Sequence, residues 1–350
     1  MRPLSKLLES IGGPDAAATA EAQRHLDTLT KPPGSLGRLE ELAARLVAVT
    51  GRAPSVSRPV IFTFAADHGV VAEGVSAYPQ SVTAQMVENF LRGGAAVNVL
   101  ARQAGARVVV ADFGVATLLG AAPGLVSRRF GPGTRNIAVG PAMTREQAIA
   151  AVEVGVTLAD DVIVTGADFL GTGEMGIGNT TAASAITAAI TGADPDAVTG
   201  RGTGIDDEGR RRKVAVVRRA LEVNHPDAGD GLDVLAKVGG FEIAGLVGVM
   251  LAGAARRVPV AVDGFIAGAA ALIAVTLAPH ARHALFASHR SAEPGHAIAL
   301  AHLGLAPYLE LDMRLGEGTG AALFVQLARA AAAIYGEMAT FKSAGVDGPV

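Results

Sequence analysis

The chain has 350 residues, of which half are hydrophobic and 18% are charged, and its formal net charge is -3. This composition excludes a disordered chain, and the length favours one large domain with a smaller unit beside it. No basic or aromatic-studded patch suggests a nucleic-acid partner. The absence of cysteine excludes disulfides and thiolate metal ligands, and it fits a reducing compartment such as the cytoplasm.

Two long apolar stretches, residues 238–255 and 258–279, raise the question of a membrane span. Each stretch contains a carboxylate, Glu242 or Asp263, and a carboxylate inside a bilayer is costly. Buried strands and helices of an α/β protein have the same hydropathy, so we expect a soluble protein without a membrane partner. Residues 1–21 lack the apolar core of a signal peptide, so no export signal is expected.

Residues 1–50 have helical patterns with polar faces and contain no convincing strand. Short β-branched runs then alternate with helical patterns, which predicts strands at 60–65, 107–113, 161–165, 258–262 and 284–287, and helices at 81–103 and 180–190. After Glu317 an Ala-rich helix is expected to about residue 340. The alternation predicts an α/β fold in which helices flank a Rossmann-like parallel sheet.

The two ends of the chain are expected to pack together as a small helical domain. We therefore predict an N-terminal segment of this small domain at 1–55, an α/β substrate-binding domain at 56–316, and a C-terminal segment of the small domain at 317–350.

Polar residues directly follow four of the predicted strands: Asp67-His68-Gly69, Asp112 with Gly114, Asp263-Gly264, and Ser288-His289-Arg290-Ser291. Ligands of open parallel sheets bind outside the carboxyl ends of the strands, so these residues indicate a polar site at one edge. Each residue taken alone is also typical of a loop-capping Asp or a hydrogen-bonded His.

Three glycine-rich segments are typical of anion-binding loops: residues 171–181 (GTGEMGIGNTT), 200–204 (GRGTG) and 316–320 (GEGTG). Glycines let backbone N–H groups face a phosphate, and a following helix adds its dipole. Asn179 and Thr180 can cap such a helix and donate to phosphate oxygens, while Lys213 or Arg201 could neutralise the charge. The alternatives are glycines that only allow tight packing and basic residues on a solvated helix face.

Gly171, Gly173 and Gly176 also match the G-x-G-x-x-G fingerprint of dinucleotide-binding oxidoreductases. That fingerprint requires a second strand soon after its helix, whereas residues 191–204 are rich in turns. Three separate loops suit a mononucleotide better. No metal-ligand spacing occurs among the eight histidines, so no metal is expected.

Glu317 lies between two glycines where a helix is expected to begin. The helix dipole favours its ionised form, and a fixed carboxylate beside a substrate nitrogen is a suitable general base. The alternative is a first-turn Glu that only stabilises the helix. Glu174 is a second carboxylate, which could face the substrate base or compete with it for backbone donors. A carboxylate near a ribosyl centre can also stabilise the positive charge of the transition state.

These motifs resemble those of the nicotinate-nucleotide–dimethylbenzimidazole phosphoribosyltransferase family. The matching segments follow in order over nearly the whole chain, at residues 29–39 (LTKPPGSLGRL), 64–102 (beginning FAADHGVVAEGVSAYPQ), 173–183 (GEMGIGNTTAA), 200–213 (GRGTGIDDEGRRRK), 238–245 (VGGFEIAG), 258–267 (VPVAVDGFIA), 288–296 (SHRSAEPGH) and 311–322 (LDMRLGEGTGAA).

The resemblance implies transfer of the phosphoribosyl group of nicotinate mononucleotide to 5,6-dimethylbenzimidazole, in cobalamin biosynthesis. It implies inversion, a homodimer, no cofactor, and Glu317 as the catalytic base. The residues expected at the phosphate and ribose are Gly176, Asn179, Thr180, Gly202 and Lys213, and those expected at the acceptor base are Tyr78, Pro79, Gln85, Glu174, Met175 and Leu315. A nucleotide-binding module that has lost its chemistry is a further alternative, against which the intact Glu317 argues.

Overall fold

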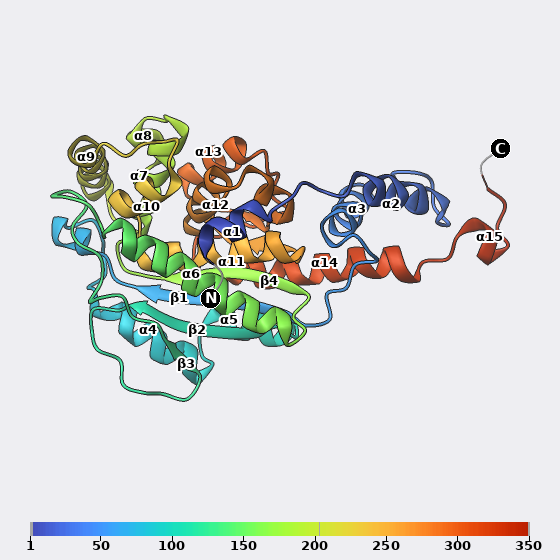
Figure 1. Ribbon diagram of the computed structural model, residues 1–350, viewed down its shortest axis with the longest axis horizontal. Helices are drawn as coiled ribbons and strands as arrows, with labels where there is room; N and C mark the ends of the chain where they lie inside the picture. The colour runs from blue at the N-terminus through green and yellow to red at the C-terminus, as the bar shows by residue number, and fades with distance from the viewer. Residues whose placement is uncertain (1–2, 203, 349–350) are drawn as a thin grey trace.

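A computed structural model describes residues 3–202 and 204–348 and contains a six-stranded sheet in which every pairing is parallel (Figure 1). The strand order is β3-β2-β1-β4-β5-β6, so the chain winds outward from the centre in both directions. The bounds are β1 (Pro59–Ala66), β2 (Arg107–Gly114), β3 (Leu125–Ser127), β4 (Phe169–Met175), β5 (Val260–Val262) and β6 (Leu285–Ala287). The predicted α/β fold with a parallel sheet is confirmed.

Strand β1 is buried along its whole length because helices cover both faces of the sheet. Phe62 and Phe64 belong to the core of one face, which is formed with α6 (Arg145–Val164), α11 (Phe241–Arg256) and α12 (Phe265–Leu277). Ile61 and Ala65 belong to the core of the other face, with α4 (Ser81–Arg92) and α5 (Ala96–Gln103). This alternation follows from the two-residue period of a strand.

Further helices pack on α12 or on its neighbour α7, and the remaining elements are short. The helices are α7 (Asn179–Thr191), α8 (Pro195–Val198), α9 (Asp207–Asn224), α10 (Gly231–Val238) and α13 (Pro294–Leu303). The short elements are the 3₁₀ turns η1 (Gly69–Glu73) and η2 (Pro279–Ala284), and a two-stranded parallel ladder of β7 (His289–Arg290) and β8 (Leu309–Glu310).

The two ends of the chain form a small helical unit that extends from the large body (Figure 1). Helices α2 (Ala16–Thr28), α3 (Arg38–Thr50) and α14 (Thr319–Glu337) share one apolar core, which continues into the sheet through Phe169 and Phe286. The short helix α15 (Phe341–Ala344) lies beyond α14, whereas α1 (Leu4–Glu9) packs on the large body against α6 and α11. The domain limits at 55/56 and 316/317 remain a prediction.

Two predicted elements differ from the structure. Residues 161–165 were expected to form a strand, but they lie at the end of α6, a helix that begins at a capping box of Thr144 and Gln147. The β-branched residues there continue a 20-residue helix, and its tertiary packing overrides their local preference. The expected helix at 81–103 is two helices, because Gly93 adopts the left-handed conformation (φ 77°) that ends α4.

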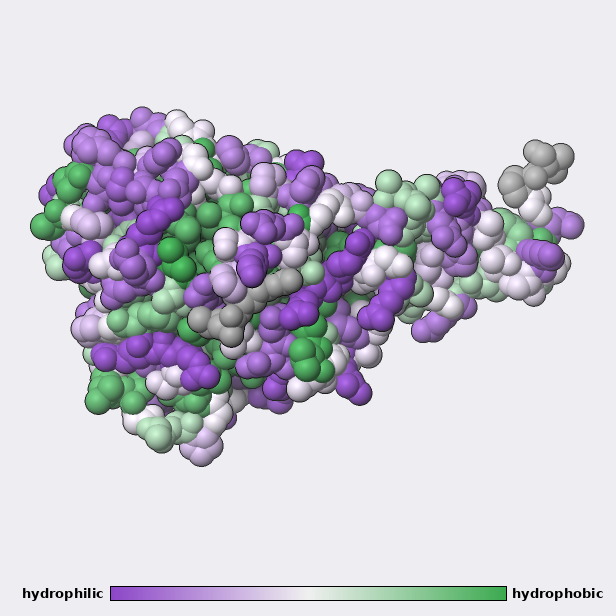
Figure 2. Space-filling model, viewed as in Figure 1, coloured by the Kyte–Doolittle hydropathy of each residue, from purple (hydrophilic) through white to green (hydrophobic). Residues whose placement is uncertain are grey.

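The surface shows the same division into a large body and a narrower extension (Figure 2). Hydrophobic residues on this face of the body lie between hydrophilic ones. Within residues 3–202 and 204–348, no helix combines the length and apolar character that crossing a bilayer requires.

Candidate active site

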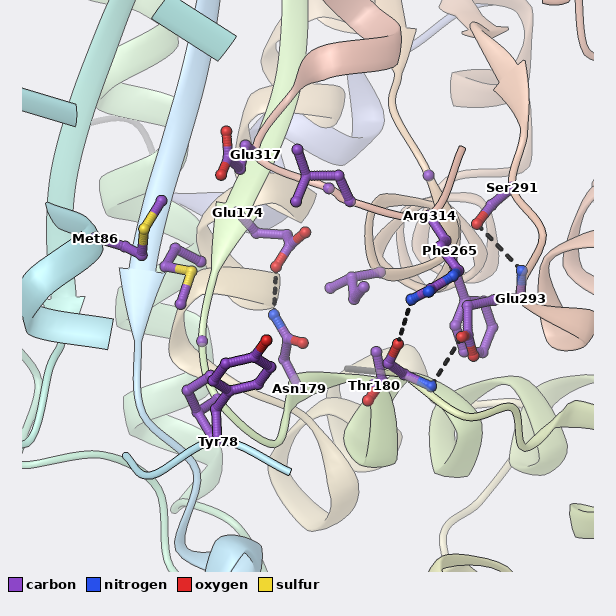
Figure 3. A pocket seen from close by; sticks show the side chains of 18 of the residues that line it. Tyr78, Met86, Glu174, Asn179, Thr180, Phe265, Ser291, Glu293, Arg314 and Glu317 are labelled. Carbon is purple, nitrogen blue, oxygen red and sulfur yellow. Dashed lines mark hydrogen bonds between the residues drawn. The ribbon is translucent and has the colours of Figure 1, made fainter. Parts of the chain in front are cut away.

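A cavity of about 670 Å³ opens beyond the carboxyl ends of β4, β5 and β6. All three glycine-rich segments contribute to its wall, through Gly176, Gly202 and Gly316. Figure 3 shows its two ends: Met86, Glu174 and Glu317 lie on one side, while Thr180, Glu293 and Arg314 lie on the other. The fold therefore brings together segments that are 140 residues apart in the sequence, between positions 176 and 316.

Most of the residues expected at the site line this cavity: Tyr78, Glu174, Met175, Gly176, Asn179, Thr180, Gly202, Leu315 and Glu317. Three do not. Pro79 and Gln85 are exposed, and Val82 and Met86 present the cavity-facing side of α4. Residues four apart share a helix face, so Gln85 points elsewhere. Lys213 is buried behind the wall.

Glu317 is held in a fixed turn at the entrance to α14. Its backbone has the left-handed conformation (φ 64°), and its carbonyl oxygen accepts a hydrogen bond from Thr63 Oγ1 at 2.8 Å. Its carboxylate accepts from the backbone N–H of Val97 at 3.2 Å, in the first turn of α5. The residue that precedes α5, Ala95, offers no side-chain acceptor, so Glu317 caps that helix. The dipole that acts on the carboxylate is therefore that of α5, not that of α14 as the sequence suggested.

Glu174 and Glu317 experience different surroundings in the same cavity. Burial, followed by the charges of Asp263 and Glu242, raises the pKa of Glu174 to about 8, and Asn179 Nδ2 donates a hydrogen bond to it. Burial also raises the pKa of Glu317, but the backbone N–H groups of α5 oppose that shift. The protein therefore stabilises the protonated form of Glu174 and provides donors for the ionised form of Glu317.

The opposite end of the cavity is built around Gly202. Lys213 Nζ lies close to its α-carbon and donates to Thr180 Oγ1 at 2.7 Å. Arg314 Nη1 donates to the Gly202 carbonyl at 3.1 Å, and Glu293 Oε1 accepts from its N–H at 2.9 Å. Arg314 and Glu293 were not expected at the site from the sequence. Arg314 lies two positions before Gly316, the first residue of the third glycine segment, and this position could have indicated it.

A phosphoribosyltransferase family model matches residues 11–346. A nicotinate-nucleotide–dimethylbenzimidazole phosphoribosyltransferase of Roseiflexus sp. (strain RS-1) is 58% identical, over 100% of this chain and 99% of that relative. The enzyme of that name from Geobacter sulfurreducens is 56% identical, over 99% of each chain. The chain belongs to the nicotinate-nucleotide–dimethylbenzimidazole phosphoribosyltransferase family. The crystal structure of that enzyme from Thermus thermophilus has a TM-score of 0.91 and 51% identity, and covers 96% of this chain and 100% of its own.

Membership of the phosphoribosyltransferase family agrees with the place of the G-x-G-x-x-G match. Gly171 and Gly173 lie inside β4 and do not form a phosphate loop. A Cβ at Gly173 would lie 2.2 Å from the Glu317 carbonyl oxygen, and one at Gly171 would lie 3.1 Å from Ala321 Cβ. These glycines allow the Glu317 turn and α14 to pack on the strand. For them the packing alternative is correct, and the dinucleotide fingerprint does not form.

The predicted polar edge is only partly used by this phosphoribosyltransferase. Gly264, His289 and Ser291 line the cavity. Asp67 instead accepts from Thr83 Oγ1 and the Ala116 N–H, both at 2.7 Å. Asp112 likewise accepts from the backbone of its own loop. No group of three or more His, Asp or Glu side chains placed to hold a metal ion occurs in the described part of the chain.

Proposed function

We propose that this chain transfers the 5-phosphoribosyl group of nicotinate mononucleotide to 5,6-dimethylbenzimidazole, giving α-ribazole 5′-phosphate and nicotinate, in cobalamin biosynthesis. The observation that carries the proposal is one cavity with a carboxylate pair at one end and a glycine-lined, cationic wall at the other. Full-length relatives at 55–58% identity bear the name of this enzyme.

The donor breaks down without help from an acid. The nicotinate ring nitrogen is positively charged while it is bonded to ribose, so it leaves with the bonding electrons as a neutral ring nitrogen. The free ring nitrogen of the acceptor attacks the opposite face of the anomeric carbon, which inverts that centre and gives the α-ribotide. The second nitrogen of the acceptor becomes acidic as positive charge develops on the ring.

Glu317 accepts that proton in the proposed reaction. Its carboxylate is held by the α5 backbone at 3.2 Å and lines the cavity, so the base needs no reorientation when the acceptor attacks. Glu174, whose pKa is raised to about 8, stays protonated at neutral pH, so it places no second negative charge near the Glu317 carboxylate. Met86, Met175 and Leu315 supply apolar surface for a flat aromatic acceptor.

The phosphate of the donor binds at the opposite end in this proposal. Gly176 and Gly202 present backbone there, and Thr180 and Arg314 supply donors. Lys213 donates to Thr180, and an ammonium has three N–H donors. Lys213 therefore supports phosphate binding from behind the cavity wall, where it orients Thr180 and adds positive charge beside Gly202.

Replacing Glu317 with Gln tests the assignment of the base. The amide keeps the size of the side chain but cannot accept a proton, so turnover at saturating substrates should fall roughly 100-fold or more. Product formation is followed by mass spectrometry with nicotinate mononucleotide and a panel of benzimidazoles, phenols and purines. Glu310→Gln, at an exposed position in β8, is the matched control. Undiminished turnover of Glu317→Gln would refute the base assignment.

We also propose that the enzyme is a cytoplasmic homodimer. Large apolar side chains such as Leu118 (78% exposed) and Val139 (73% exposed) support a contact with a second copy, and the lack of cysteine suits a reducing compartment. Light scattering should give twice the chain mass of 35.3 kDa. A mass of one chain over the micromolar range would contradict the dimer.

A further inference from the structure

Glu293 is a carboxylate at the end of the cavity where the proposed function places a phosphate. Its side chain is buried (6% exposed) and lies just before α13. One oxygen accepts from the Gly202 N–H at 2.9 Å. The other has no hydrogen-bond partner within the part of the chain that the structure describes. A buried carboxylate oxygen without a donor is costly, so its presence beside an anion site requires a reason.

The position of that second oxygen is closely defined. A Cβ at Gly200 would lie 2.1 Å from Glu293 Oε2, so only glycine leaves room for the carboxylate. The Gly202 N–H and the Gly200 α-carbon thus fix the positions of the two oxygens. Figure 3 shows Glu293 on the same side of the cavity as Arg314, with the hydrogen bonds of both drawn as dashed lines.

Lys213 faces the same loop from α9 and is almost completely buried (1% exposed). Its Nζ would lie 2.9 Å from a Cβ at Gly202, whose N–H Glu293 holds. A buried ammonium requires a nearby negative charge when the site holds no phosphate. Burial lowers the pKa of Lys213 to about 8, and the charge of Glu293 acts in the opposite direction.

We propose that Glu293 is a positioning residue for phosphate binding, which anchors Gly202 through its N–H and serves as the counter-charge of Lys213 until the phosphate of the substrate arrives. The inference rests on the proposed function, because that function places the phosphate at this end. Glu293 supplies the negative charge that acts on Lys213 in the free enzyme, and the phosphate adds a second one when it binds.

The variant Glu293→Gln separates the two parts of this role. Its amide oxygen can still accept from Gly202, but the negative charge is gone. At pH 6.5, which lies well below the Lys213 pKa of about 8 in the parent, the variant should bind nicotinate mononucleotide as tightly as the parent or more tightly, because a like charge is removed. As the pH rises, the variant should lose affinity at a lower pH than the parent does, and the midpoint of that loss should be shifted down by about one pH unit.

Glu293→Ala removes the anchor as well and should bind more weakly at every pH. Dissociation constants are measured by calorimetry from pH 6.5 to 9.5 with nicotinate mononucleotide and with inorganic phosphate. Glu310→Gln is the control that removes an exposed charge. Thermal unfolding of each variant confirms that it is folded, and Glu293→Gln, which keeps the anchor, remains informative where Glu293→Ala does not fold.

The comparison at matched pH removes the contributions of the other groups around Lys213. Apart from Glu293, the charged and titratable groups on α9 and on the elements near it are Arg314 across Gly202, Asp206 at the start of α9, the pairs Arg210–Asp196, Arg201–Asp207 and Arg219–Glu73, the pair Lys237–Asp233 on α10, and His296 on α13. All are the same in both proteins.

Two results are decisive. The proposal is supported if Glu293→Gln loses affinity at a lower pH than the parent and binds with undiminished affinity at pH 6.5. If the affinities of the parent and of Glu293→Gln change with pH in the same way over the whole range, the proposal is wrong. If the parent itself does not bind nicotinate mononucleotide, the proposed function fails instead, so the two failures are distinguishable.

Discussion

Gly173 determines where the turn that carries Glu317 can lie. It is buried in the middle of β4, and the Glu317 carbonyl oxygen is so close that a Cβ would lie 2.2 Å from it. Thr63, on the neighbouring strand β1, donates to that same oxygen at 2.8 Å. Gly173 was expected from the sequence to belong to an anion-binding loop, but in the structure it leaves room for the turn that carries the proposed base.

Gly173→Ala should lower turnover and stability together. The new methyl group forces the Glu317 turn away from β4, which costs about 1–3 kcal/mol of unfolding free energy. Because the base is displaced, turnover should fall roughly 100-fold, while binding of nicotinate mononucleotide at the other end is retained. Steady-state kinetics and chemical denaturation measure both. Gly140→Ala is the control, since a Cβ there meets no atom within 4 Å. Unchanged turnover for Gly173→Ala would show that the turn does not depend on this glycine.

Individual site residues differ in how far the sequence could predict them. The glycines that flank Glu317 mark a sharp turn before a helix, and this local signal is present in the sequence. Glu293 and Arg314 are defined by their contacts with Gly202, about 90 and 110 positions away in the chain. Such contacts form only when the fold is complete, so no local sequence pattern predicts them.

At the scale of elements, strands with strong local signals were predicted well. The structure extends the predicted β1 by one residue at each end, and β2 by one residue at its end. Strand β4 was missed because glycines at 171 and 173 lower its β propensity, and the β-branched residues just before it took its place. Its glycines serve the packing of α14, a tertiary requirement that outweighs local preference.

The start of α14 is set by a residue of another strand. Asp263, which follows β5, accepts hydrogen bonds from the N–H groups of Gly318, Gly320 and Ala321 at 2.7–3.2 Å. Asp263 thereby caps the helix that follows Glu317. Through α14 and α5, one carboxylate fixes the position of the other.

Asp263→Asn should therefore impair catalysis from a distance. The new amide group points an N–H at the Gly318 N–H, so one helix donor loses its acceptor, at a cost of about 1–3 kcal/mol. We expect the turnover number to fall more than tenfold with little change in the KM for nicotinate mononucleotide. Asp112→Asn is a matched control, because Asp112 also accepts from backbone N–H groups at a strand end, but those groups belong to Gly114 and Val115 and not to the start of α14. Equal turnover numbers for the two variants would contradict the coupling.

At the scale of the whole molecule, the small helical unit is joined firmly to the large body. Arg38 donates to the carbonyls of Ala306 and Pro307, and its guanidinium lies 4.3 Å from the centre of the Tyr308 ring. The buried pair of Lys31 and Glu40, at 2.8 Å, fixes the loop before α3. The sequence predicted that both chain ends pack together. It could not show that their core continues into the sheet, because that depends on the side to which Phe169 and Phe286 point.

The buried carboxylates also make stability depend on pH in a defined direction. The pKa of Glu174 is raised from its model-peptide value of 4.5 to about 8 in the folded protein, so between these values the folded chain holds a proton that the unfolded chain has released. Stability from this group is complete below about pH 4.5 and is lost as the pH rises toward 8.

Glu174→Gln removes that dependence, since the amide does not titrate. The free energy of unfolding of the variant relative to the parent should rise with pH over this window, by at most about 1.4 kcal/mol per pH unit. Thermal unfolding midpoints at pH 5 and pH 8 measure the slope, which is independent of any constant cost of the amide in its new contacts. Glu310→Gln, at an exposed position, should show no such slope. A constant difference between Glu174→Gln and the parent at both pH values would mean that Glu174 is already ionised in the folded enzyme, and the division of roles between Glu174 and Glu317 would then have to be reversed.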